Sequence, residues 1–197
     1  MRSRLMLVTC AALISLPAAA LDTDWKAEAV ARAMEYHAAN LPELCVSPTQ
    51  SDMVPASFEL QIGEETAARQ ALLVEFPCQF GAYSQTAVYL MSDQHGTVSE
   101  VLFPSPVVEV TYHGEGSMTV DEVTITETRD LREVVNPSYD ASSRTMTERN
   151  KWRGLGDAYT LTQWGYKNGK FEIMTFAVDG SFDGKDNPTT LIDNEIW

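Results

Sequence analysis

The stretch YTLTQWGYKNGKFEIMTFAV, residues 159–178, decides the fold class of this chain. Apolar and polar side chains alternate over residues 160–166 and again over residues 171–178, which is typical of strands with one buried face. The residues Lys167-Asn168-Gly169 separate the two segments. Asn-Gly accepts the positive φ angles that both central positions of a type I′ turn require. The stretch therefore predicts an antiparallel β-hairpin.

Six more segments show the same alternation and predict further strands. They are residues 57–62, 71–76, 87–91, 98–103, 107–112 and 122–128. Turn signals lie at residues 93–96, 104–106 and 113–116, and a loop is expected over residues 48–55. About eight short strands at this spacing predict a mainly β protein, an antiparallel β-sandwich or barrel-like domain.

One segment before the strands has a different period. Apolar side chains recur at helical spacing over residues 25–41, with Asp24 as a candidate N-cap and Pro42 beyond the end. The pattern predicts one N-terminal amphipathic helix packed against the β-domain.

The first twenty residues have the features of a secretory signal peptide. Arg2 and Arg4 precede an apolar run over residues 5–16, and small side chains follow at residues 18–20. The run is too short to span a bilayer, and no later segment is apolar enough to do so. We therefore predict cleavage after Ala20, a single β-rich domain over residues 21–197 with no transmembrane segment, and a periplasmic or secreted location.

The chain is strongly acidic. It has 28 Asp and Glu residues against 14 Lys and Arg residues, for a formal net charge of −14. Loss of Arg2 and Arg4 with the signal peptide would make the charge more negative still. Such a surface repels nucleic acid and anionic lipid headgroups and favours a cationic partner, such as a basic envelope protein. The simpler interpretation is that the charge only keeps the protein soluble.

Two cysteines remain outside the predicted signal peptide, Cys45 and Cys78. Export into an oxidising compartment favours a disulfide bond between them. A free redox pair and a metal site are the alternatives. There is no C-x-x-C motif, and no histidine lies beside either cysteine in the sequence.

The run KWRGLGDAY, residues 151–159, combines two glycines with an arginine and an aspartate. A strand-like segment follows it, whereas a dinucleotide-binding loop needs a helix there, and Walker and nucleophile-elbow motifs are absent. We interpret it as a tight turn in which Gly154 and Gly156 permit left-handed or bulged backbone and Arg153 pairs with Asp157. A binding loop is the alternative.

Two motifs carry a resemblance to a known family. FPCQFGAY at residues 76–83 is one; the other comprises NPSYD at 136–140, RGLGD at 153–157, Trp164 and NGKF at 168–171. Over roughly residues 70–175 the chain resembles an uncharacterised bacterial envelope family, domain-of-unknown-function family 1176. The resemblance implies an exported, β-rich, disulfide-bearing protein with no known reaction.

This sequence departs from the family pattern at one position. Family members usually have cysteine after Gly-x-Gly-Asp, where this chain has Ala158, and no cysteine follows it. We interpret this as loss of a second bridge, which leaves Cys45 and Cys78 as partners for each other.

The sequence contains few candidates for catalysis or metal binding. His37, His95 and His113 stand in no known triad motif. Asp179, Ser181 and Asp183 alternate before Gly184, as in the first half of a calcium loop, but Thr190 stands where a bidentate acid is expected. The segment is a weak calcium candidate and otherwise a polar loop. No other cofactor is predicted.

These observations favour an exported, non-enzymatic β-domain that binds a protein or ligand in the cell envelope. The candidate binding loops contain Gly81, Ala82, Tyr83, Arg153, Gly154, Gly156 and Asp157. The net charge suggests a narrower alternative, an inhibitor of a cationic enzyme such as a lysozyme. A hydrolase that acts on cell-wall polymer through carboxylates, and a structural or stress-protection protein without a ligand, are further alternatives.

Overall fold

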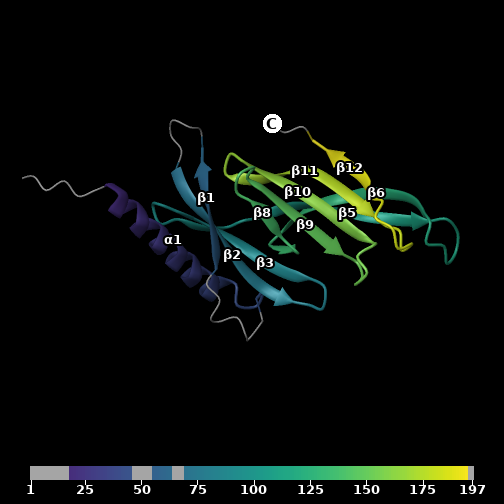
Figure 1. Cartoon of the computed structure of the whole chain (residues 1–197), viewed down its shortest axis with the longest axis horizontal. Coiled ribbons are helices and arrows are strands. Elements are labelled where there is room, and N and C mark those ends of the chain that lie inside the picture. Colours follow the sequence, from purple (N-terminus) through teal and green to yellow (C-terminus); the bar gives the residue numbers. More distant parts are fainter. Residues whose placement is uncertain (1–17, 46–54, 64–68, 195–197) are drawn as a thin grey trace, which may run out of the picture.

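A computed structural model describes residues 18–45, 55–63 and 69–194 of the chain. This part is mainly β, with one helix near the N-terminus, antiparallel strand pairs and no closed barrel, which confirms the predicted fold class (Figure 1). The elements are α1 (Ala18–Asn40), β1 (Ala56–Ile62), β2 (Arg69–Phe80), β3 (Gln85–Asp93), β4 (Val98–Glu100), β5 (Phe103–Tyr112), β6 (Val120–Leu131), β7 (Glu133–Val135), β8 (Ser138–Asp140), β9 (Thr145–Lys151), β10 (Tyr159–Lys167), β11 (Lys170–Asp179) and β12 (Thr189–Asp193).

The strands form two five-stranded sheets and a separate hairpin. The first sheet has the order β1-β2-β3-β4, and β7 also pairs with β3. The second has the order β12-β11-β10-β9-β8, and within the described residues β5 pairs with β6 alone. The indole Nε1–H of Trp164 in β10 donates to the Pro104 carbonyl oxygen at 2.6 Å, which fastens the hairpin to the second sheet.

The hydrophobic core has two parts, one on each face of the first sheet. Leu73, Tyr89, Phe103 and Trp164 belong to the part shared with the second sheet. The other part contains residues of α1 together with alternate residues of β2 and β3: Ala29, Ala33, Leu72, Val74, Val88 and Leu90. The described fold is therefore a helix, a sheet and a second sheet in successive layers (Figure 1).

This layering corrects one prediction. Residues 71–76 and 87–91 were expected to be strands with one exposed face, yet nearly all of their side chains are buried. The reason is that α1 covers the face of β2 and β3 that would otherwise meet water.

The hairpin predicted from residues 159–178 is confirmed. β10 and β11 pair with Lys167 opposite Lys170. Asn168 and Gly169 have φ angles of 52° and 89°, as a type I′ turn requires.

The helix differs from its prediction at its first residue. It begins at Ala18, so Asp24 lies inside the helix, and its prediction as the N-cap is wrong. The alanines at residues 18–20 have high helix propensity and extend the helix upstream. It ends at Asn40, before Pro42, as predicted. The signal peptide and its cleavage after Ala20 remain predictions. Among the described residues, no helix is both long and apolar enough to cross a bilayer.

The predicted disulfide between Cys45 and Cys78 is present. It joins the segment after α1 to β2 and closes a loop with a sequence separation of 33 residues. A loop of this size would stabilise the fold by about 3–4 kcal/mol in the chain-entropy account of disulfides.

The strand boundaries differ from prediction at two places. Residues 98–103 divide between β4 and the start of β5, and the turn predicted at 104–106 is part of β5. Since β5 pairs only with β6, its other edge tolerates prolines that lack an N–H. The strands β7, β8, β9 and β12 were not predicted, and most of the loop predicted at 48–55 lies outside the described residues.

Candidate functional site

The run at residues 151–159 forms a tight turn between β9 and β10. The backbone N–H of Trp152 donates to the Ala158 carbonyl oxygen at 2.9 Å, and the N–H of Gly156 donates to the Arg153 carbonyl oxygen at 3.0 Å. Gly156 has a φ of 71°, so its left-handed backbone agrees with the prediction. Gly154 is not among the glycines with positive φ.

Arg153 and Asp157 pair within this turn, as the sequence predicted. The guanidinium Nε donates to Asp157 Oδ1 at 2.7 Å, and a second guanidinium nitrogen donates to Oδ2. Asp157 is buried, and the hydrogen bonds from Arg153 are the main reason that its pKa lies well below the ordinary value. The carboxylate is therefore charged at neutral pH and holds the two sides of the turn together.

The same pair fastens a second loop, residues 180–187, to the turn. Arg153 donates to the Phe182 carbonyl oxygen at 2.9 Å, and the N–H of Gly184 donates to Asp157 Oδ2 at 2.9 Å. The Arg153 guanidinium also lies over the Phe182 ring, 5.0 Å from its centroid. Two segments that are distant in sequence are thus joined by charged and backbone hydrogen bonds.

A neighbouring cluster holds the other side of the 180–187 loop. The Arg149 guanidinium lies 3.7 Å from the centroid of the Tyr159 ring and 3.4 Å from a carboxylate oxygen of Asp186. The Tyr159 hydroxyl donates to Asp186. Burial, together with this hydrogen bond, raises the pKa of Tyr159 to about 12, so the hydroxyl keeps its proton. The loop is therefore held at both ends.

The other candidate loop, at Gly81, Ala82 and Tyr83, meets the turn directly. The N–H of Gly81 donates to the Ser84 carbonyl oxygen at 2.6 Å and closes the β2–β3 connection. A Cβ built on Gly154 would lie 3.4 Å from Cδ1 of Tyr83, so the Tyr83 ring packs on the Gly154 backbone. The structure thus brings together the two motifs that carried the family resemblance.

Three large apolar side chains are exposed on or next to the two loops that meet here, and we call them the apolar corner. They are Phe80, Tyr83 and Leu155, with exposed fractions of 54%, 46% and 79%. Phe80 ends the strand that leads to Tyr83, and Leu155 follows Gly154 in the turn. The corner therefore offers an apolar surface on loops that are held by the network beneath them.

The weak calcium candidates form a closed hydrogen-bond network. The N–H and Oγ–H of Ser181 donate to Asp179 Oδ1 at 3.0 and 2.7 Å, and the N–H of Asn187 donates to Oδ2 at 2.9 Å. Asp183 Oδ1 accepts from the N–H of Lys185 at 3.0 Å. A cation would compete with these donors for the carboxylate oxygens.

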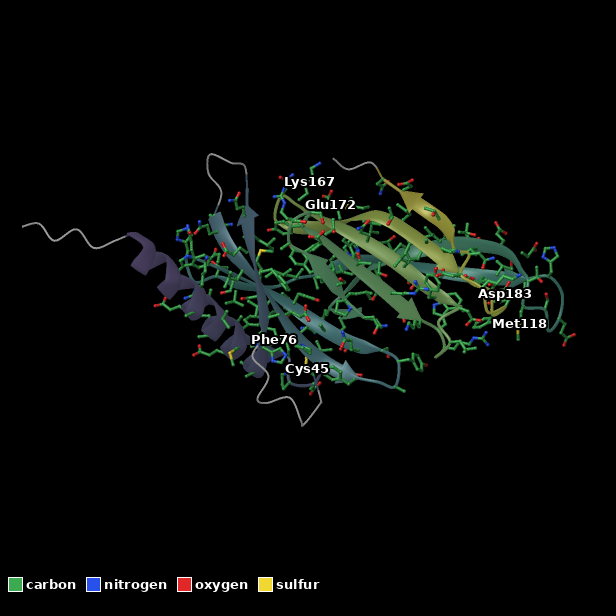
Figure 2. The ribbon with its side chains drawn as sticks, viewed as in Figure 1. Cys45, Phe76, Met118, Lys167, Glu172 and Asp183 are labelled. Atoms are coloured by element: carbon green, nitrogen blue, oxygen red, sulfur yellow. A yellow bond between two sulfur atoms is a disulfide. The ribbon has the colours of Figure 1, made fainter. Side chains whose placement is uncertain are left out.

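The weak calcium candidates Asp179, Ser181 and Asp183 also line a cavity of about 300 Å³ between the 180–187 loop and β6. Its apolar wall includes Met118, Val120 and Val123. Met118 and Asp183 lie at the same end of the molecule, far from Lys167 and Glu172 in the β10–β11 hairpin (Figure 2). The loop therefore has the cavity on one side and the Arg153–Asp157 pair on the other.

Sequence reasoning missed one close relationship. His37 Nε2 lies 3.1 Å from Cys45 Sγ, although no histidine neighbours the cysteines in the sequence. The ligand atoms of His37, Cys45 and Cys78 lie within 4.8 Å of one another, but the disulfide occupies both sulfurs. The spacing of His37 and Cys45 across the end of the helix was the only available signal. His95 and His113 lie on exposed turns, as expected.

Glu148 is a buried acid with a raised pKa, which is the property expected of a catalytic carboxylate in the hydrolase alternative. It lies in β9, is 2% exposed and accepts a hydrogen bond from the Val135 N–H at 2.9 Å. Burial raises the pKa of its carboxyl. Its contact is with β7, so this acid links the two sheets.

The fold and the corner define a layered β-protein that presents a small apolar surface at one loop cluster. The sequence matches the family described as "Protein of unknown function (DUF1176)" over residues 17–190. The chain therefore belongs to this family, and the match is wider than the 70–175 segment on which the resemblance rested. No curated protein and no solved structure matches the chain.

Proposed function

We propose that this chain is an exported, non-enzymatic binding protein whose apolar corner docks a basic protein of the cell envelope. The observation that carries the proposal is Leu155, which is 79% exposed at the tip of a turn fixed on both sides. Tyr83 packs on one side of the turn, and the Arg153–Asp157 pair closes it. A large apolar side chain held in this way is suited to be an anchor in a partner's pocket.

The rigidity of the corner supports a binding role. A loop that is ordered before binding loses little conformational entropy when a partner docks. Of the six large hydrophobic side chains that are exposed among the described residues, three lie in this corner. Such clustering on neighbouring loops favours an interaction surface over scattered surface residues, which need no explanation.

The charge of the chain supports a basic partner. With a net charge of −14, the protein attracts cationic surfaces over long range and accelerates their encounter. In this proposal the charge supplies the steering, and the apolar corner supplies the specific contact. Binding should therefore weaken with salt through the rate of association.

Capture from the native envelope tests the proposal. The tagged protein is crosslinked to its neighbours at low and at high salt, and the products are identified by mass spectrometry. We expect a basic protein in stoichiometric amount at low salt and much less of it at high salt. Recovery of nothing above an untagged background would contradict a protein-binding role.

The same charge favours a narrower candidate, inhibition of a cationic envelope-directed enzyme such as a lysozyme. The measurement is the rate of cell-wall lysis by lysozyme with increasing amounts of this protein. Inhibition that saturates at one equivalent and weakens with salt would support it, and an unchanged rate would exclude lysozyme as the target.

A further inference from the structure

The two cysteines of the disulfide are buried to different degrees. Cys78 lies in β2 beneath the helix and is fully buried, with an exposed fraction of 0%. Cys45 follows the end of α1 and is half-buried. Cys45 is therefore the cysteine that a reagent from solvent is expected to meet first.

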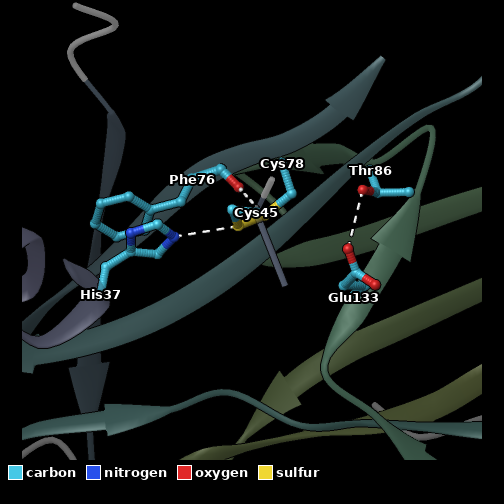
Figure 3. The surroundings of a disulfide bond; sticks show 6 residues. All are labelled: His37, Cys45, Phe76, Cys78, Thr86 and Glu133. Carbon is cyan, nitrogen blue, oxygen red and sulfur yellow. Dashed lines mark hydrogen bonds between the residues drawn. A yellow bond between two sulfur atoms is a disulfide. The ribbon is translucent and has the colours of Figure 1, made fainter. Parts of the chain in front are cut away.

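The imidazole of His37 is held beside that same sulfur. Its Nε2 lies 3.1 Å from Cys45 Sγ, and its ring stacks on Phe76 with centroids 4.4 Å apart and planes at 8° (Figure 3). Burial lowers the pKa of His37, so the ring is neutral at neutral pH. A neutral imidazole can accept a proton from a thiol or donate a hydrogen bond to a thiolate, depending on its tautomer.

The surroundings of Cys78 have the opposite character. The Phe76 carbonyl oxygen lies 3.3 Å from Cys78 Sγ and is placed to accept a hydrogen bond from its S–H when the pair is reduced (Figure 3). A carbonyl acceptor and full burial favour the neutral thiol. The reduced pair would thus contain one accessible thiolate and one buried thiol.

From this asymmetry we propose that Cys45–Cys78 is an exchangeable disulfide that oxidises proteins carrying two thiols, with Cys45 as the attacked sulfur and His37 as the group that stabilises its thiolate. This inference does not depend on the apolar corner, and it adds a redox reaction to the binding role proposed above, in place of a purely non-enzymatic one. An accessible cysteine for the incoming thiolate to attack and a buried cysteine to leave match the two roles that thiol–disulfide exchange requires.

The exchange proceeds in two balanced steps. A substrate thiolate attacks Cys45 Sγ, the bond to Cys78 breaks, and its electron pair leaves on Cys78 Sγ, which takes up a proton. The second substrate thiolate then attacks the substrate sulfur of the mixed disulfide, and the electron pair leaves on Cys45, beside His37. The substrate gains a disulfide and loses two protons, of which one is held on the Cys78 thiol and the other passes to solvent. This chain gains two electrons and is left with a Cys78 thiol and a Cys45 thiolate.

His37 affects the equilibrium as well as the rate. A hydrogen bond that stabilises the Cys45 thiolate stabilises the reduced state, and a stabilised reduced state makes the disulfide a stronger oxidant. Loss of the imidazole should therefore make the disulfide harder to reduce. A purely structural contact between His37 and the disulfide would not change the redox equilibrium in this direction.

The test uses the folded, oxidised protein and a synthetic peptide with two cysteines. We expect the peptide to become oxidised as Cys45 and Cys78 become thiols, and brief alkylation at partial reduction to label Cys45 before Cys78. In glutathione buffers, His37→Gln should shift the equilibrium toward the disulfide by about tenfold or more, the size expected when a charge-stabilising partner is lost. His95→Gln, which alters an exposed histidine, should leave the equilibrium unchanged.

Several results would overturn the proposal. One is a disulfide that stays intact in the native protein at every glutathione ratio and leaves the peptide reduced. Another is a His37→Gln variant with the equilibrium constant of the unaltered protein. If His37→Gln does not fold, the peptide reaction and the alkylation order of the unaltered protein still decide the question, since labelling of Cys78 first contradicts the assigned roles.

Discussion

The ring of Tyr83 packs on the backbone of Gly154, with Cδ1 of the ring 3.4 Å from the position that a Cβ on the glycine would occupy. The two residues belong to loops that are far apart in the sequence, one after β2 and one before β10. Their contact joins the two loops of the apolar corner, since Leu155 directly follows Gly154 in the turn. The Arg153–Asp157 pair beneath them fixes the corner to the 180–187 loop.

The two glycines of the turn should respond differently to alanine. Gly156 has a positive φ, so Gly156→Ala should lower the free energy of unfolding by about 1–2 kcal/mol, the cost of left-handed backbone for an L residue. In Gly154→Ala the added Cβ meets Tyr83 at an ordinary contact distance, so the free energy of unfolding should change by less than about 0.5 kcal/mol. Urea unfolding of both variants measures this, and equal losses would contradict the described backbone.

The charged pair in the turn should make stability depend on acid pH. The pKa of Asp157 is lowered in the folded protein, chiefly by hydrogen bonds from Arg153. Its contribution is complete above the ordinary carboxyl pKa of about 4 and is lost as the pH falls toward the folded-state pKa. Asp157→Asn should therefore lower the Tm at pH 7, and the gap from the unaltered protein should narrow below pH 4.

Thermal unfolding at a series of pH values checks this, with Asp193→Asn at the exposed end of β12 as the matched control. The control should follow the unaltered protein at every pH. A gap for Asp157→Asn that stayed constant from pH 7 to pH 2 would show that the ion pair does not titrate as described.

Glu148 should make the stability of the fold depend on pH in the opposite direction. Its pKa is raised by burial, so the folded protein holds this proton more tightly than the unfolded chain does. Stability from this group is complete below the ordinary carboxyl pKa and declines as the pH rises through the folded-state value. Glu148→Gln keeps an acceptor oxygen for the Val135 N–H and carries no charge. Its stability relative to the unaltered protein should rise with pH above about 4, and an unchanging difference would contradict the account.

Calcium should have no effect on stability. Both carboxylate oxygens of Asp179 accept hydrogen bonds from Ser181 or Asn187, so a cation would have to displace donors that the loop already supplies. We expect the same Tm in calcium, in magnesium and in a chelator. A rise in Tm with calcium alone, absent in Asp183→Asn, would show that the 180–187 loop rearranges to bind the ion.

The local features of the fold could be predicted from the sequence. The hairpin at residues 159–178 has alternation on both sides of an Asn-Gly turn, and these signals need no distant partner. By contrast, β9 contains charged residues at successive positions, and Glu148 is buried where β7 supplies a hydrogen-bond donor for its carboxylate. Such a strand has no apolar alternation, so the sequence pattern could not reveal it.

The candidate site could be predicted only in part. The Arg153–Asp157 pair was predictable because a tight turn brings these residues together. The contacts of Tyr83 with Gly154, of Gly184 with Asp157 and of His37 with Cys45 depend on how distant elements pack. No local pattern specifies such contacts, and the loops were therefore predicted separately.

Site-specific photo-crosslinking from the apolar corner tests the central claim most directly. A photoreactive side chain replaces Leu155 in one protein and Leu102 in another. Leu102 is also exposed, at 44%, but lies beside Lys170 at the opposite end of β10 and β11. We predict that the protein captured from the envelope is crosslinked from position 155 and not from position 102, and that Leu155→Asp abolishes its capture. Equal crosslinking from both positions, or capture that survives Leu155→Asp, would show that the corner is not the docking surface.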